Sequence, residues 1–226
     1  MAKGVRDLVV YIDRKKLSFY GAAFDQIGSL ALDKKLVNDL EVIDRNALID
    51  GISDLVKVNQ ASARLVIVFA DSASIVDDLG AELTPAQLFQ AEKDFYNLVP
   101  FDETATKLIK FAKGYKAIGV NWEFYRVIVE ALAPQGFRVA AVIPALAVTD
   151  LNQKEGLTDR SGATIISKLS SFKNFSFYQG VTEKEEPEVN AQPKPKSEKK
   201  SKLLPMLIGV FVLLTIILVL VVVFGS

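Results

Sequence analysis

Carboxylates that directly follow apolar runs are the residues of this chain best suited to chemistry. Asp13 follows the apolar residues 8–12, and Asp71 follows residues 65–70, which are apolar at every position. Two such acids at the ends of neighbouring strands could hold metal ions for hydrolysis if a third carboxylate joined them. The chain has no histidine and no cysteine. Any chemistry would therefore run on carboxylates, hydroxyls, Lys and Arg, without imidazole bases, thiolates or the usual zinc ligands.

The helix predicted between these two runs does not supply the third metal ligand. Asp44 can cap a helix over residues 45–58. Its apolar face is formed by residues at helical spacing, namely Leu48, Ile52, Leu55 and Val56. Asp50 and Asp54 fall on the opposite side of this helix and point away from a sheet that it would cover. We therefore expect no metal site and no catalytic residues, and we interpret the two strand-end acids as ordinary turn residues.

The first third of the chain predicts an antiparallel meander followed by a helix and a buried strand. Residues 8–12 and 17–23 predict a hairpin, and a third extended segment covers residues 27–37. The run at residues 65–70 is typical of a strand buried on both faces between parallel neighbours. Residues 71–83 are expected to form a loop or a short helix.

The second third carries two strong helix starts. Thr84 is a cap, Pro85 takes the first helical position and Gln87 closes a capping box. This helix is expected to run to about residue 98 and to bury Leu88, Ala91, Phe95 and Leu98. Asn121 caps a further helix whose apolar stripe is Phe124, Val127, Ile128, Ala131 and Leu132. A hairpin over residues 107–120 is expected between the two helices, around Lys113-Gly114.

The C-terminal part predicts a strand, a helix and a membrane anchor. Residues 137–143 form an apolar run, and a helix is expected over residues 158–171. Residues 181–202 combine three prolines, five acids and six lysines and predict a disordered charged linker. Residues 203–224 carry no charge, and as a helix of about 33 Å they would cross a hydrocarbon core of about 30 Å.

Lysines before the apolar stretch predict its orientation. Lys199, Lys200 and Lys202 lie directly on its N-terminal side. The positive-inside rule then places the bulk of the chain in the cytoplasm, as a single-pass, tail-anchored protein. These lysines could also attract anionic lipid. Over the whole chain, 27 Lys and Arg balance 27 Asp and Glu, so no nucleic-acid partner is expected.

A block in the second half of the chain resembles a known family. Residues 108–148 resemble the inserted subdomain of the PilM and GspL cytoplasmic proteins of type IV pilus and type II secretion machines. In those proteins a strand pair leads into a helix, a turn containing Gly, and a strand with a proline near its end. The matching parts of this chain are residues 115–120, residues 124–133, Gly136 and Pro144.

This resemblance extends over about residues 5–148 and implies both a fold and a role. The fold would be a ribonuclease-H-like, actin-like α/β half within residues 1–180, with an inserted small α/β subdomain at about residues 84–148. The role would be a non-catalytic scaffold without cofactors, tethered to the bacterial inner membrane and binding other assembly-platform proteins.

Asp13 is the only candidate residue for nucleotide binding. Actin-like ATPases place Gly and small residues after the matching Asp, so that backbone N–H groups can reach the phosphates. Here residues 14–16 are Arg-Lys-Lys. Residues 159–164 are faintly similar to the second phosphate loop, but no buried strand precedes them, and we interpret them as a helix start at Thr158. Two alternatives stay open: a nucleotide-binding ATPase completed by a partner chain, and a tail-anchored adaptor unrelated to pili.

Two features could serve protein binding. Trp122 and Tyr125 lie at a predicted helix start, where they either pack in the core or form an exposed patch for a partner. An edge strand of the predicted sheet could also accept a strand from another protein.

Overall fold

The protein's computed structural model describes residues 7–21, 24–57, 63–152 and 154–178, all within one compact unit, Met1–Gly180. The strands are β1 (Leu8–Ile12), β2 (Lys16–Gly21), β3 (Gly28–Ala31), β4 (Val37–Asn38), β5 (Glu41–Val42), β6 (Ala63–Phe69), β7 (Ser74–Leu79), β8 (Thr104–Phe111), β9 (Gly114–Asn121) and β10 (Phe137–Pro144). The α-helices are α1 (Arg45–Leu55), α2 (Pro85–Leu98), α3 (Trp122–Leu132) and α4 (Asp159–Ser167).

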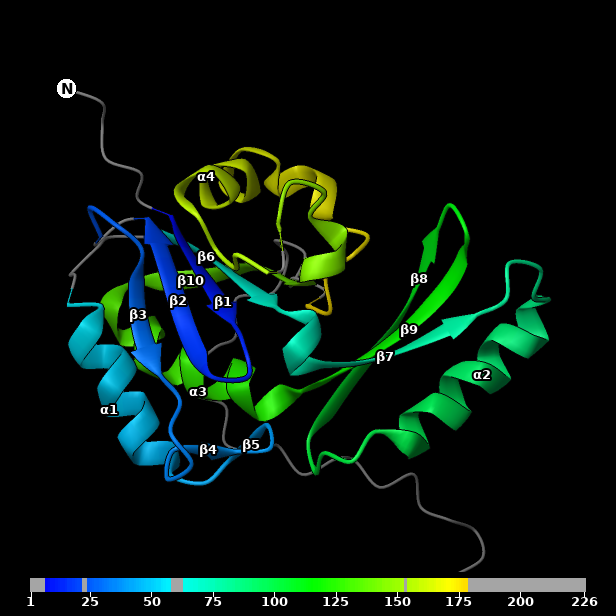
Figure 1. Ribbon diagram of the computed structural model, residues 1–226, viewed down its shortest axis with the longest axis horizontal. Coiled ribbons are helices and arrows are strands. Elements are labelled where there is room, and N and C mark those ends of the chain that lie inside the picture. The colour runs from blue at the N-terminus through cyan, green and yellow to red at the C-terminus, as the bar shows by residue number, and fades with distance from the viewer. Residues whose placement is uncertain (1–6, 22–23, 58–62, 153, 179–226) are drawn as a thin grey trace, which may run out of the picture. The chain divides into compact units, whose positions relative to one another are not determined.

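Five strands form a large sheet in the order β10-β6-β1-β2-β3 (Figure 1). The first three strands pair antiparallel, whereas β6 runs parallel to β1 and β10 runs parallel to β6. An antiparallel meander with two further parallel strands beside β1 is the predicted ribonuclease-H-like arrangement, which is confirmed. Because β6 lies between two parallel neighbours and under helices, its apolar run is buried on both faces.

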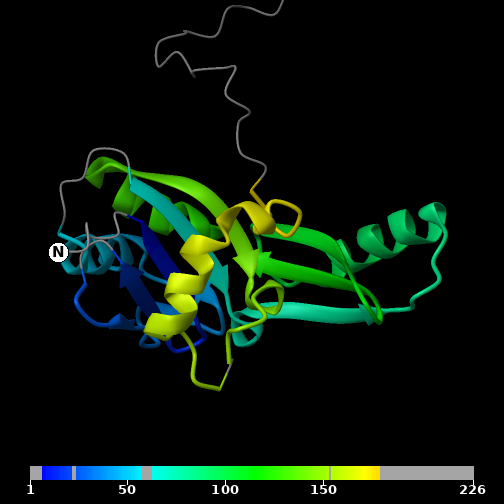
Figure 2. The ribbon, with the colours of Figure 1, turned by 90° about the horizontal axis from the view of Figure 1, so that it is seen from above.

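Helices cover both faces of this large sheet. Figures 1 and 2 show α1 and α3 on one face and α4 on the other. On the second face Gly162 of α4 lies against Tyr20 of β2, and a Cβ at Gly162 would come within 2.4 Å of the Tyr20 ring. The absence of a side chain at Gly162 therefore allows α4 to pack closely on the sheet.

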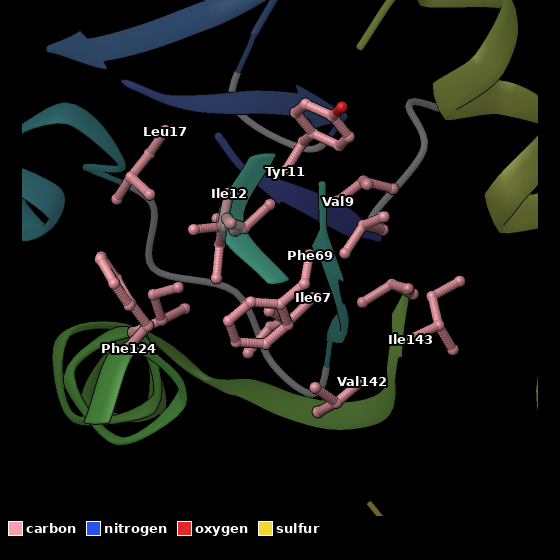
Figure 3. Close-up of a cluster of buried hydrophobic side chains, with 14 of the residues drawn as sticks. Val9, Tyr11, Ile12, Leu17, Ile67, Phe69, Phe124, Val142 and Ile143 are labelled. Carbon is pink, nitrogen blue, oxygen red and sulfur yellow. The ribbon is translucent and has the colours of Figure 1, made fainter. Parts of the chain in front are cut away.

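The core between the large sheet and α3 contains the predicted apolar stripe. Phe124 of α3 lies beside sheet residues such as Ile12 and Phe69 (Figure 3). All five stripe residues are buried, namely Phe124, Val127, Ile128, Ala131 and Leu132. The prediction for this helix is confirmed from its cap to its buried face.

A second, three-stranded antiparallel sheet has the order β7-β9-β8. The helix α2 covers one face, where Phe95 and Val99 lie over Gly119 of β9. The segment that forms the small sheet therefore begins at β7 and ends at β9. Residues 84–148 were the expected insertion, but α3 packs against α1 and β10 belongs to the large sheet. The inserted sheet thus begins and ends earlier in the chain than expected.

Three local expectations were wrong. Residues 71–83 were expected to form a loop or a short helix, but a 3-10 turn (Asp71–Ala73) leads directly into β7. The sequence of β7 lacks the alternation of apolar and polar residues that indicates a strand, and β7 is a strand because it pairs with β9. Leu98 is 72% exposed, because Val99 turns inward and covers the small sheet in its place. The third strand, expected over residues 27–37, ends at Ala31.

Candidate functional site

The carboxyl ends of β1 and β6 bring the two strand-end acids to one edge of the large sheet. Asp13 accepts hydrogen bonds from the Lys15 backbone N–H (3.0 Å) and from the Ser72 hydroxyl (2.9 Å). Ser72 follows Asp71 directly, so the chain after β6 helps to hold the turn after β1. The Asp13 carboxylate therefore closes a turn in this structure, which is the ordinary role expected for it.

Neither aspartate of α1 joins this edge. Asp50 and Asp54 are exposed, and Asp54 pairs with Lys57 at 3.1 Å. Among the described residues there is no group of three acids, His or Cys that could hold a metal ion.

The segment after Asp13 lacks the glycine and small residues of a phosphate-binding loop. Arg14 forms an ion pair with Asp39 at 2.8 Å, and the Asp13 N–H donates to the Lys16 carbonyl at 3.0 Å. These contacts close a tight, basic hairpin. Farther along, Thr158 caps α4 by accepting from Ser161 N, so residues 159–164 form the start of a helix.

Tyr11 lies just before this turn and has a buried hydroxyl. The side chain is 1% exposed, and its hydroxyl has no hydrogen-bond partner among the described residues. Figure 3 shows the hydroxyl directed away from the Phe69 and Phe124 rings. Burial raises the pKa of Tyr11 to about 12, and the charges of Asp13 and Asp71 add to the shift. This residue was not singled out from the sequence, where it reads as one more apolar position in a strand.

The small sheet presents an open edge along β8. Trp122 N donates to Glu103 O at 2.7 Å, so residues 103 and 122 form a hydrogen-bonded pair just before β8 begins. Hydrogen-bonded and non-hydrogen-bonded pairs alternate along antiparallel strands, so every second residue of β8 bonds to β9. Odd-numbered residues of β8 direct their N–H and C=O groups to β9. Even-numbered residues direct theirs outward. Between residues 105 and 111 these are Thr106, Leu108 and Lys110, which we call the β8 edge.

Across the described ranges, no backbone hydrogen bond occupies the β8 edge. The other edge strands differ from it. β7 carries Asp77 and Asp78, which discourage strand addition, and β3 has only four residues. β8 has eight residues without an acid or a proline. The described edge strand β10 also has eight residues, but its Val142 N–H and carbonyl are bonded to Ser176 and Phe177.

The α2 helix beside this sheet exposes large apolar side chains. Phe89 is 70% exposed, Tyr96 53% and Leu98 72%. Phe89 and Tyr96 are two turns apart and lie on the same outward face of the helix. Such residues are the anchors that protein interfaces favour.

Trp122 and Tyr125 take an intermediate position between core and surface. Their rings stack with centroids 4.1 Å apart, and both are half-buried against the core. Burial raises the pKa of Tyr125, with a further contribution from Tyr178. The pair therefore serves mainly to pack α3, and α2 provides the more exposed apolar surface.

Residues 203–224 and the flanking Lys199, Lys200 and Lys202 lie outside the described residues. In the part of the chain that is described, no helix is both long and apolar enough to cross a membrane. The predicted anchor therefore stays a prediction.

Comparison with known proteins gives structural likenesses only. No family model and no curated protein matches the chain. Among solved structures, a PilM-PilN type IV pilus biogenesis complex is 16% identical with a TM-score of 0.42, over 61% of this chain and 47% of that one. The cytoplasmic domain of EpsL, an inner membrane component of the Vibrio cholerae type II secretion system, is 16% identical with a TM-score of 0.36, over 62% and 58%.

A third likeness is to a Bacteroides thetaiotaomicron protein with an actin-like ATPase fold, at 17% identity and a TM-score of 0.34, covering 59% of this chain and 51% of that one. The chain thus spans about half the length of the solved chains that it resembles. These proteins are of the kind that the sequence resemblance named. At such identities and scores, function has to be inferred from this chain's own residues.

Proposed function

We propose that the folded unit is a protein-binding scaffold that performs no catalysis of its own. The open β8 edge carries this proposal, since it offers unpaired backbone groups to an extended segment of a partner. The exposed Phe89 and Tyr96 on the neighbouring helix α2 would widen the contact. From the sequence resemblance, the partner would be a component of a type IV pilus or type II secretion assembly platform.

The second part of the proposal is membrane tethering. Residues 203–224 would anchor the scaffold in the inner membrane with its folded unit in the cytoplasm, and Lys199, Lys200 and Lys202 would set this orientation. Deleting residues 203–224 should move the chain from the floating membrane fraction to the soluble fraction. If the complete chain sediments as a soluble protein, the tether is refuted while the scaffold proposal still stands.

Proline substitution tests the β8 edge. Thr106→Pro removes an outward N–H but leaves the odd-numbered bonds to β9, because proline is tolerated where the N–H faces outward on an edge strand. Val76→Pro is the matched control on β7, where Val76 also faces outward by its register with Ile118. Circular dichroism would first establish that both variants fold.

The readout uses the absence of cysteine from the chain. A single Cys at position 110 (Lys110→Cys) on the β8 edge, or at position 78 (Asp78→Cys) on β7, carries a photocrosslinker in membranes that contain the platform proteins. Crosslinks are expected from position 110 and not from position 78, and Thr106→Pro should abolish them while Val76→Pro preserves them. Equal crosslinking from both edges, or crosslinking that survives Thr106→Pro, would refute the β8 edge as the binding surface.

A further inference from the structure

The last described residues of the chain, 175–178, form a strap that contacts both sheets. Ser176 is 3% exposed. Its hydroxyl accepts from Val142 N (3.0 Å) and Tyr178 N (3.1 Å) and donates to Tyr178 O (2.8 Å). These three bonds use the full capacity of a hydroxyl group. The Ser176 hydroxyl therefore joins Tyr178 within the strap to Val142 of β10 and holds the strap against the large sheet.

On the large sheet, the strap occupies the outer edge of β10. Val142 donates its N–H to the Ser176 hydroxyl, and its carbonyl accepts from Phe177 N at 2.7 Å. The Phe177 ring also meets Phe69 of β6 edge to face, with ring centroids 6.5 Å apart. The strap therefore covers β10 where it would otherwise present an open edge.

On the small sheet, the strap contacts β8. Lys107 Nζ donates to the Ser176 carbonyl at 2.5 Å, and the Phe111 ring lies 6.3 Å from that of Phe175. Burial lowers the pKa of Lys107, consistent with a lysine drawn out of solvent to reach the strap. Ser176 thus binds the large sheet through its hydroxyl and the small sheet through its carbonyl.

We propose that the strap is a latch that couples the small sheet to the β10 edge. While the strap is seated, Lys107 and Phe111 hold β8 in place. When it detaches, β8 and the backbone of Val142 are released together. This inference goes beyond the proposed scaffold role and is tested without any partner.

Hydrogen exchange on the full chain in detergent micelles tests the coupling. Ser176→Ala removes the three hydroxyl bonds, and Lys107→Met removes the hydrogen bond from β8 to the strap while keeping most of the side-chain stem. The reporting amides are those of Val142 and Phe177 for the strap, and those of Ala105, Ile109 and Phe111, which face β9, for β8. The matched controls are Ser171→Ala, an exposed serine, and Lys110→Met, an exposed lysine of the same strand.

Both test variants should speed amide exchange about tenfold, at the strap amides and at the β8 amides alike. The reason is that losing these hydrogen bonds lowers the free energy of local opening. The controls should leave both sides unchanged. If Ser176→Ala loosens Val142 but leaves the β8 amides protected, the strap is a local anchor and the coupling is refuted. If Ser176→Ala fails to fold, Lys107→Met decides alone, and unchanged exchange at Val142 and Phe177 in that variant would refute the latch.

Discussion

At the scale of single residues, Tyr11 is the clearest departure from ordinary core chemistry. The buried Tyr11 hydroxyl has no partner among the residues that the structure describes, so it loses its hydration without gaining a hydrogen bond. Tyr11→Phe should therefore raise the free energy of unfolding by about 1 kcal/mol at neutral pH. Urea denaturation measures the change, and Tyr96→Phe on the exposed face of α2 is the control, expected to be neutral. A loss of stability in Tyr11→Phe would show that the hydroxyl has a partner.

The raised pKa of Tyr11 predicts that the folded state loses stability at alkaline pH. The Tyr11 pKa is about 12 in the folded chain against 10.0 ordinarily, so between these values the unfolded state releases its proton first. This ionisation leaves the free energy of unfolding unchanged below about pH 10 and lowers it as the pH rises toward 12, by up to about 2.7 kcal/mol. Comparing wild type with Tyr11→Phe across this range isolates the contribution. Parallel curves for the two proteins would contradict the shift.

Asn121 joins two elements through one side chain. Its Oδ1 accepts from Glu123 N to cap α3, and its Nδ2 donates to the Leu40 carbonyl, both at 2.9 Å. Leu40 has a φ of 70°, a strained conformation for leucine that this bond helps to hold. Asn121→Ala should cost about 2–3 kcal/mol, more than the roughly 1 kcal/mol of an exposed cap such as Thr84→Ala.

Asn121→Asp separates the two roles, since it keeps the cap acceptor but loses the donor to Leu40. Thermal or urea unfolding should find Asn121→Asp clearly less stable than wild type. If Asn121→Asp is as stable as wild type, the bond to Leu40 contributes nothing.

At the scale of elements, the seating of α2 on the small sheet depends on Gly119. A Cβ there would lie 2.7 Å from Val99 Cγ2 and 3.3 Å from the Phe95 ring. Gly119→Ala should therefore push α2 outward and cost about 1–3 kcal/mol. Gly80→Ala is the control, because a Cβ at Gly80 meets nothing within 4 Å. Equal stability of the two variants would show that α2 is not packed as described.

At the scale of the whole molecule, the nucleotide alternative remains testable. A scaffold without a nucleotide site should show no shift in thermal unfolding when magnesium and ATP are added to the full chain. A bound ligand at 100 times its Kd would stabilise the folded state by about 2.7 kcal/mol. A clear shift that Asp13→Asn abolishes would favour an ATPase completed by a partner chain and overturn the non-catalytic proposal.

The sequence alone determined the helix starts and the central sheet. Asp44, Thr84, Asn121 and Thr158 each cap a helix as expected. Such caps could be predicted because the bond from cap to backbone N–H spans only two or three residues, so local sequence decides it. The apolar run of β6 could also be predicted to form a buried strand, because a strand buried on both faces has no position for a polar residue.

Only the tertiary structure decided the features on which the proposed function rests. β7 became a strand through pairing with β9, some 40 residues later in the chain. Which strand kept an open edge, and where the strap binds, followed from contacts between distant segments. Lys107 and Ser176 are separated by 69 residues. Neither residue type carries a local signal for such a bond, since it depends on where two sheets come to lie in the folded chain.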